Sequence, residues 1–204
     1  MTWGSAGQMC GRMLPWDMRH VKMRKRTIRK AVSPAQEQAP VLERSVDGNM
    51  PQKSGLGIYA VSAGSLKVAA VVVLNALGDI YDPSTGEKIA GPKLPGMDGF
   101  ADSREALYKL SQQTDLFRAK NFPILPLGAI ITNGDFSKAE LNKIASMTRS
   151  AYSRCINPVG TMADGDSIYA ASCGPRVTAD VNMTGTLAAE VMAEAIQIAV
   201  KAAK

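Results

Sequence analysis

Two apolar runs near residue 60 predict a β-hairpin. Leu56–Val61 and Leu66–Leu74 are rich in aliphatic and β-branched residues, and only Ser62–Ser65 separates them. Runs of this length joined by a short loop that contains glycine are typical of paired antiparallel strands. The second run is apolar at nearly every position instead of alternating, which is typical of a strand with both faces covered. We therefore expect it at the centre of a sheet buried between two layers.

Three later segments carry helical patterns. The first extends from Asp102, a residue suited to cap a helix, to about Leu116. The second opens with the capping box Ser137-Lys-Ala-Glu140, repeats apolar residues at spacings of three and four through Cys155, and stops at Asn157-Pro158. The third covers about Thr186 to Ala202. Each is long enough to place one apolar face on a sheet.

Two further strands complete the predicted order. Ile124–Thr132 and Ser167–Ser172 are short apolar runs, and the polar stretch Asp82–Gly99 between the hairpin and the first helix is rich in turn residues. The order is β-β-α-β-α-β-α, which predicts an α/β (α+β) fold with a mixed sheet, because the first pair is a hairpin. Three helices are too few to cover both faces of such a sheet. We infer that a neighbouring sheet or chain supplies the rest.

The positive charge of the chain lies in its first residues. Residues 1–45 contain nine Lys and Arg against three Asp and Glu, a surplus of six that equals the net charge of +6 of the whole chain. We therefore divide the chain into a basic leader, residues 1–50, and a domain, residues 51–204. The leader shows no helical or strand period, and its favoured interpretation is a disordered segment. A basic arm that binds nucleic acid is the alternative, and a secretory signal is a poor fit.

The composition argues against a metal, a cofactor or a membrane. The chain has a single histidine and three cysteines, Cys10, Cys155 and Cys173, whose spacing suits no zinc site. We expect no cofactor, reduced thiols and a cytoplasmic location. No uninterrupted apolar run approaches the roughly 20 residues that cross a bilayer.

Three segments together resemble the L-aminopeptidase/D-esterase family, the DmpA-type or β-peptidyl aminopeptidases. They are residues 66–91 (LKVAAVVVLNALGDIYDPSTGEKIAG), 127–147 (LGAIITNGDFSKAELNKIASM) and 154–172 (RCINPVGTMADGDSIYAAS), and their order and spacing match as well. The resemblance covers residues 50–204 and implies the C-terminal part of a four-layer αββα sandwich whose N-terminal part is missing. It also implies a precursor that cleaves itself before a Ser or Thr, which becomes an N-terminal nucleophile.

The resemblance implies roles for three residues. Asn75, at the end of the second strand, would donate to the oxyanion that forms when an amide is attacked; without the resemblance it would be a turn-forming Asn. Asp164 and Asp166 match the polar loop before a later strand, where they would hold an ammonium group or pass a proton. The alternative for Asp164-Gly165-Asp166 is a solvated acidic turn.

The nucleophile itself is missing from the pattern. In the family, the hydroxyl residue stands seven positions before the Thr of the strand, and counting back from Thr132 gives Leu125. No Ser or Thr lies between Thr114 and Thr132. If an insertion has shifted the comparison, Asn121 precedes the cleavage position and Phe122 replaces the nucleophile. Neither Leu nor Phe can form an acyl-enzyme.

These observations predict an aminopeptidase-family hydrolase that is truncated or inactive. Its substrates would be short peptides or amino-acid amides and esters, and it would form a homo-oligomer or pair with a related chain. Three alternatives remain open: a non-catalytic interaction subunit or remnant, an acyltransferase like the ornithine acetyltransferases, and a nucleic-acid-binding protein that uses residues 19–30.

Overall fold

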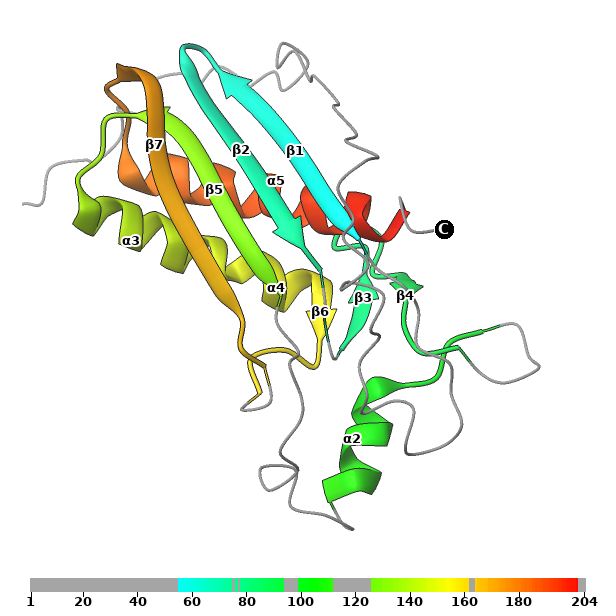
Figure 1. Cartoon of the computed structure of the whole chain (residues 1–204). Helices are drawn as coiled ribbons and strands as arrows, with labels where there is room; N and C mark the ends of the chain where they lie inside the picture. Colours follow the sequence, from blue (N-terminus) through cyan, green and yellow to red (C-terminus); the bar gives the residue numbers. More distant parts are fainter. Residues whose placement is uncertain are drawn as a thin grey trace, which may run out of the picture.

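The fold consists of two sheets and four helices in the part of the chain that the structure describes. A computed structural model describes residues 55–74, 76, 78–93, 99–111, 126–161 and 164–201 (Figure 1). The predicted leader, residues 1–50, lies outside them. The elements are β1 (Leu56–Ala63), β2 (Leu66–Val73), β3 (Asp79–Tyr81), β4 (Lys88–Ala90), α2 (Ser103–Ser111), β5 (Leu127–Gly134), α3 (Lys138–Thr148), α4 (Ser150–Cys155), β6 (Ile156–Asn157), β7 (Ser167–Val177) and α5 (Val181–Lys201).

The larger sheet is mixed, as the sequence predicts. Its strand order is β1-β2-β5-β7, with β1–β2 and β2–β5 antiparallel and β5–β7 parallel. The predicted hairpin is confirmed, and Gly64 supplies the positive φ of 62° in its turn. A smaller sheet of order β4-β3-β6 continues from the end of β2. The α/β class is therefore confirmed.

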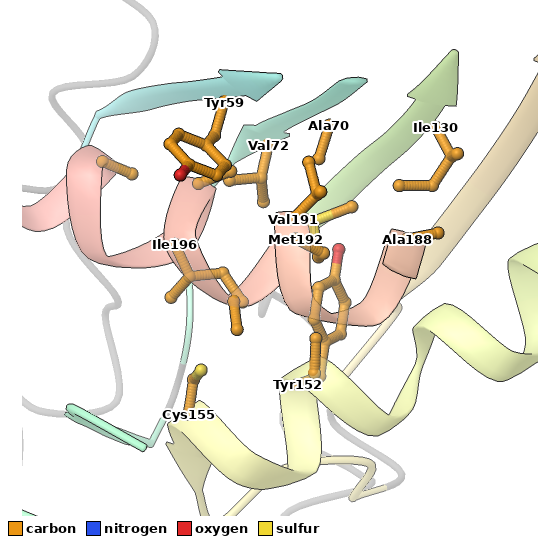
Figure 2. Packing of buried hydrophobic residues seen from close by; sticks show 14 of the residues in the cluster. Tyr59, Ala70, Val72, Ile130, Tyr152, Cys155, Ala188, Val191, Met192 and Ile196 are labelled. Carbon is orange, nitrogen blue, oxygen red and sulfur yellow. The ribbon is translucent and has the colours of Figure 1, made fainter. Parts of the chain in front are cut away.

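One face of the larger sheet is covered by helices. The side chains of Val68, Ala70 and Val72 on β2 are fully buried, and they alternate with partly exposed neighbours. Helix α5 packs against β1 and β2, and α3 packs against β7 and α5 (Figure 1). Figure 2 shows the side chains of α5, among them Val191, meeting the strands and α4 in one apolar cluster. This helix–sheet interface is the core that holds the fold together.

A glycine sets how closely α5 approaches the sheet. A Cβ built on Gly57 in β1 would lie 1.8 Å from the carbonyl oxygen of Ala195. Only glycine leaves room for the helix backbone there. The first strand is thereby pressed against the C-terminal half of α5.

The opposite face of the sheet has no helix cover among the described residues, in line with the inference that three helices are too few. The uniformly apolar second run predicted cover on both sides, yet Ala69, Val71 and Val73 on this face of β2 are only partly buried. On the neighbouring strands Leu127, Ile131 and Tyr169 are 46%, 38% and 65% exposed. None of the helices that the structure describes lies over this face (Figure 1). The described residues therefore form one helix layer and one sheet layer of the four implied by the resemblance.

The helices confirm the predicted signals and shift some boundaries. Both hydrogen bonds of the Ser137–Glu140 capping box are present. Asp102 caps α2 by accepting from the amides of Arg104 and Glu105. The single helix expected from Ser137 to Cys155 is wrong, because the chain turns at Arg149 and divides it into α3 and α4. Residues 112–125, and with them the predicted end of the first helix and start of the next strand, lie outside the described residues.

The last helix is longer than predicted. It begins at Val181 instead of Thr186, and the Asp180 carboxylate accepts from the amide of Met183 to cap it. With 21 residues it also meets the length and composition of a membrane span, which no single apolar run in the sequence suggested. However, 67% of its most apolar stretch is buried within the fold. Its apolar residues serve the core in this structure.

Short strands were missed in the turn-rich region. The stretch Asp82–Gly99 was predicted to be irregular, but it contains β4, which pairs with β3. Strand β6 was likewise not predicted, and β7 extends to Val177 beyond the predicted Ser172. Two- and three-residue strands carry too little periodicity to be recognised from sequence.

Candidate functional site

The predicted site segments converge at one edge of the larger sheet. Val73 near the end of β2 pairs with Leu127 at the start of β5, which pairs with Ser167 at the start of β7. The amide of Ser167 also donates to the carbonyl of Pro126 (3.2 Å). Asn75 follows Val73 by two positions, Leu125 precedes Leu127 by two, and Asp166 directly precedes Ser167. We call this end of the sheet the edge site.

Two of the predicted residues lie outside the described residues. Asn75, the predicted oxyanion donor, and Leu125, the expected nucleophile position, belong to this group. Their predicted roles stay predictions. The strand register nevertheless brings the flanking positions of both to the same edge as Asp164 and Asp166.

The Asp164 side chain accepts hydrogen bonds from Thr161, three residues earlier in the same loop. One of its carboxylate oxygens accepts hydrogen bonds from the amide of Thr161 (2.8 Å) and from the Thr161 hydroxyl (2.9 Å). The amide of Asp164 donates in return to the carbonyl of Thr161. These bonds fix the turn that leads into β7. Their effect is to set the position of the next carboxylate, that of Asp166.

Asp166 differs from Asp164 in every respect that matters for chemistry. Both of its carboxylate oxygens are shielded from solvent, and no side chain among the described residues donates a hydrogen bond to either. Burial, with the neighbouring charge of Asp164, raises the pKa of Asp166 to about 6, although Arg149 and the amide of Gly160 offset part of the rise. A carboxyl group with a pKa close to neutral is suited to accept and return a proton.

Tyr152 approaches Asp166 from beneath the sheet. Its side chain is 1% exposed and points from α4 towards Met192 and the strands (Figure 2). A Cβ built on Gly128 would lie 2.7 Å from the Tyr152 hydroxyl, so glycine makes room for the phenol at the start of β5. The hydroxyl has no hydrogen-bond partner among the described residues. Burial raises the pKa of Tyr152, and the charge of Asp166 adds to the rise.

The helical spacing predicts Tyr152 on an apolar face and does not indicate that its hydroxyl group is buried as well. The spacing of three and four residues correctly predicted that the ring is buried. A tyrosine at a core position usually finds a partner for its hydroxyl. That signal, together with the Asp-Gly-Asp loop, is the one that points to buried polar groups at the edge site.

A buried ion pair joins β3 and β4 beside the start of α2. The Asp79 carboxylate, with no exposed surface, pairs with the Lys88 ammonium (2.6 Å). It also accepts from the hydroxyl of Ser103 (2.7 Å), and the Lys88 ammonium donates to the carbonyl of Ala101 (2.8 Å). These bonds join β3, β4 and the start of α2. They hold the chain four residues after Asn75 in a defined place.

The cysteines offer no substitute nucleophile in the described region. Cys155 is completely buried, and burial raises the pKa of its thiol to about 11. Such a thiol is protonated at neutral pH and inert. Cys173 is exposed on β7, far along the strand from Ser167. Cys10 lies outside the described residues.

The described surface grooves lie away from the edge site. One, of about 670 Å³, is lined by residues of β3, α4 and β6, including Tyr81, Arg154 and Asn157. Another, of about 370 Å³, lies between α3, α4 and α5. Neither is lined by Asp164 or Asp166. The candidate site therefore rests on its side chains and its place at the sheet edge.

Comparison with known proteins supports the predicted family resemblance. An uncharacterized aminopeptidase of Mycobacterium leprae is 29% identical over 171 residues, which cover 74% of this chain and 45% of the relative. A 6-aminohexanoate-oligomer endohydrolase of Kocuria sp. (strain KY2) is 27% identical over 179 residues, covering 76% and 47%. The chain is a homologue of these hydrolases. It spans about half the length of the curated relatives it matches.

Two solved structures also align with part of this chain. The L-aminopeptidase D-Ala-esterase/amidase of Ochrobactrum anthropi, described as a variant of the Ntn hydrolase fold, aligns with a TM-score of 0.47 and 15% identity over 78% of this chain and 44% of that one. A β-aminopeptidase of Burkholderia sp. aligns with a TM-score of 0.44 and 14% identity, covering 74% and 42%. No family model matches the sequence.

Proposed function

We propose that this chain has the edge site of an aminopeptidase-type hydrolase for short peptides, amides or esters, without the nucleophile needed for turnover. The observation that carries the proposal is the Asp166 carboxyl group, which is shielded from solvent, accepts from no side chain in the described region, and lies beside the start of β5. The start of β5 is where the resemblance requires a hydroxyl residue. The homologues are named as an uncharacterized aminopeptidase and as a 6-aminohexanoate-oligomer endohydrolase.

The roles of the residues follow from the chemistry. A hydroxyl at position 125 would attack the preceding carbonyl, and Asp166 would accept the proton it releases. Asn75 would donate to the oxyanion that forms. Leucine at position 125 supplies no oxygen, so neither self-cleavage nor acyl transfer can begin. An acyltransferase function requires the same hydroxyl and is weakened equally.

Denaturing gels and p-nitroanilide substrates of several amino acids test this proposal. The unmodified protein is expected to remain one band at 21.7 kDa and to release no p-nitroaniline. A Leu125→Thr variant is expected to cleave itself before residue 125, and Leu125→Thr combined with Asp166→Asn is expected to remain intact. Leu125→Thr combined with Asp164→Glu serves as the matched control at the neighbouring carboxylate, because it keeps an acceptor for Thr161.

Two outcomes would contradict the proposal. Hydrolysis or cleavage by the unmodified protein would show that the nucleophile lies elsewhere. An intact and inactive Leu125→Thr variant that is correctly folded would show that the edge is no hydrolase site. The second result would favour the alternative function, a non-catalytic subunit that pairs with another chain, for which the uncovered apolar sheet face is the supporting observation.

A further inference from the structure

The chain turns at Arg149 between α3 and α4, where neither proline nor glycine marks a break. Backbone hydrogen bonds hold the turn, because the Arg149 amide donates to the carbonyl of Ser146 (3.3 Å) and the Arg149 carbonyl accepts from the amide of Tyr152 (3.0 Å). The side chains of Thr148 and Tyr152 on either side are buried, whereas that of Arg149 is exposed. The break therefore keeps one charged side chain at a fixed point between two core residues.

The side chain of Arg149 reaches the loop that leads to Asp166. A Cβ built on Gly160 would lie 3.1 Å from the Nη2 atom of Arg149, which is closer than an ordinary contact. Gly160 also has a positive φ of 70°, which residues with a side chain rarely adopt. Its amide is directed to the carboxylate of Asp166 and stabilises the ionised form. Gly160 thus brings together a guanidinium group and a backbone donor beside one carboxylate.

The charge of Arg149 favours the ionised form of Asp166. Its guanidinium forms no ion pair with a carboxylate of the described region, so its charge is not neutralised there. Asp164, on the same loop, acts in the opposite direction, and Asp166 in turn raises the pKa of Tyr152 on α4. Helix α5 places the apolar Met192 beside the Tyr152 hydroxyl (Figure 2). Arg149 therefore opposes the effects that burial and Asp164 have on the same carboxyl group.

We propose that Arg149 is a positioning residue of the edge site, whose guanidinium, together with the Gly160 amide, keeps the Asp166 carboxylate ionised beside the start of β5. Only an ionised carboxylate can accept a proton from a nucleophile. The inference deepens the proposed function and rests on it for the step in which Asp166 takes up that proton. The balance of charge at Asp166 is a property of the folded chain and can be measured without turnover.

NMR of the full chain with isotope-labelled aspartate carboxyl groups tests this balance. The Asp166 signal, identified by its loss in Asp166→Asn, is expected to titrate at about 6 in the unmodified protein. Arg149→Gln is expected to move this midpoint upward by about 0.5–1 pH units, a modest shift because solvent screens an exposed guanidinium. Arg149→Lys is expected to restore most of the difference. Arg154→Gln is the matched control, since it removes an exposed arginine of α4 whose charge acts on Cys155, and it is expected to leave the midpoint unchanged.

A pair of glycine substitutions separates the Arg149 contact from backbone strain. Gly160→Ala places a methyl group 3.1 Å from the Arg149 guanidinium and also strains the backbone at its φ of 70°. Gly174→Ala strains the backbone in the same way, at a φ of 79°, but its Cβ meets no atom within 4 Å. Both substitutions are expected to lower the Tm. Only Gly160→Ala is expected to raise the Asp166 midpoint.

Self-cleavage in the Leu125→Thr background measures the consequence for the proposed chemistry. The ionised fraction of Asp166 falls at a given pH when its midpoint rises. Adding Arg149→Gln is therefore expected to slow cleavage about two- to fivefold at the pH of the original midpoint, and to leave the rate unchanged well above the new one. A purely structural defect would lower the rate at every pH.

Several results would overturn the proposal. They are an Asp166 midpoint that Arg149→Gln leaves in place, a midpoint that Arg154→Gln moves as far, equal shifts in Gly160→Ala and Gly174→Ala, or a slowing of cleavage that persists at high pH. A folded Leu125→Thr variant that never cleaves would contradict the proposed function instead. The Asp166 midpoint in the otherwise unmodified chain would still decide the role of Arg149.

Discussion

The two faces of the four-stranded sheet differ in how far their apolar side chains are buried. On one face Val68, Ala70 and Val72 pack beneath α5 and lose all exposure to solvent. On the other face Ala69, Val71 and Val73 are just as apolar but remain partly exposed. Side chains of adjacent residues in a strand point to opposite faces. The contrast therefore shows that the sequence of each strand encodes two interfaces, of which the described residues complete one.

The largest expected loss of stability comes from breaking a buried ion pair, compared with breaking an exposed one. Replacing Lys88 with Met leaves the fully buried Asp79 carboxylate without its partner and should cost about 3–5 kcal/mol of unfolding free energy. Arg176→Met is the control, because the pair of Arg176 with Asp135 is at a similar distance, 2.7 Å, but more than half exposed. Its loss should cost less than about 1 kcal/mol. Urea unfolding measures both, and equal costs would contradict the assignment.

Adjacent isoleucines on β5 test the two faces directly. Ile130 is completely buried and Ile131 is 38% exposed. Ile130→Ala should cost about 2–5 kcal/mol through lost burial and the cavity left behind. Ile131→Ala, measured at protein concentrations low enough to exclude association, should change stability by less than about 0.5 kcal/mol. A similar loss at both positions would mean that the open face is covered within one chain.

Substitutions that enlarge a side chain on β5 also distinguish the two faces of the sheet. Gly128→Ala places a Cβ 2.7 Å from the Tyr152 hydroxyl and 2.8 Å from the terminal methyl of Met192. The resulting overpacking should cost about 1–3 kcal/mol. Ala129→Val, which adds two methyl groups on the open face, should be nearly neutral at low concentration, because valine suits a strand. Thermal unfolding compares the two, and a tolerated Gly128→Ala would place the phenol elsewhere.

The smallest effect concerns pH. Asp166 titrates at about 6 in the folded state, above its ordinary value of 3.8, so the folded protein binds the extra proton between these values. Stability should therefore fall as the pH rises from about 4 to about 6. Asp166→Asn should flatten this part of the profile and add roughly 1 kcal/mol at pH 7, after allowance for the partial exposure of the residue. Asp164→Asn, which removes the charge that adds to the rise, should flatten this part of the profile less than Asp166→Asn does, because burial is the larger cause.

Much of the fold follows from local sequence signals. The hairpin, the Ser137–Glu140 box and the Asp102 cap depend on residues close together in the chain, and each was predicted. The division of the helix at Arg149 was not, since no proline or glycine marks it. The early start of α5 was missed because Asn182, Thr184 and Gly185 have low helix propensity. Gly185 is retained because its missing Cβ leaves room for Met147.

The site was predictable in its segments and less so in its details. The resemblance identified the loop of Asp164 and Asp166, and the strand register brings that loop to the start of β5. Only the three-dimensional contacts separate the two carboxylates: that of Asp164 accepts from Thr161, and that of Asp166 accepts from no side chain in the described region. The apolar second run correctly indicated a central strand. The small number of predicted helices also indicated that they could not cover both faces of the sheet.

The pairing of β2 with β5 also constrains how the chain reaches this structure. It joins positions as far apart as Lys67 and Asn133, 66 residues away along the chain. Closing so long a loop costs entropy that is regained only when the strands pair. The local hairpin of β1 and β2 should therefore form first, and until β5 pairs with it both of its outer edges and both apolar faces are exposed to solvent. Refolding yield should accordingly fall as the protein concentration rises.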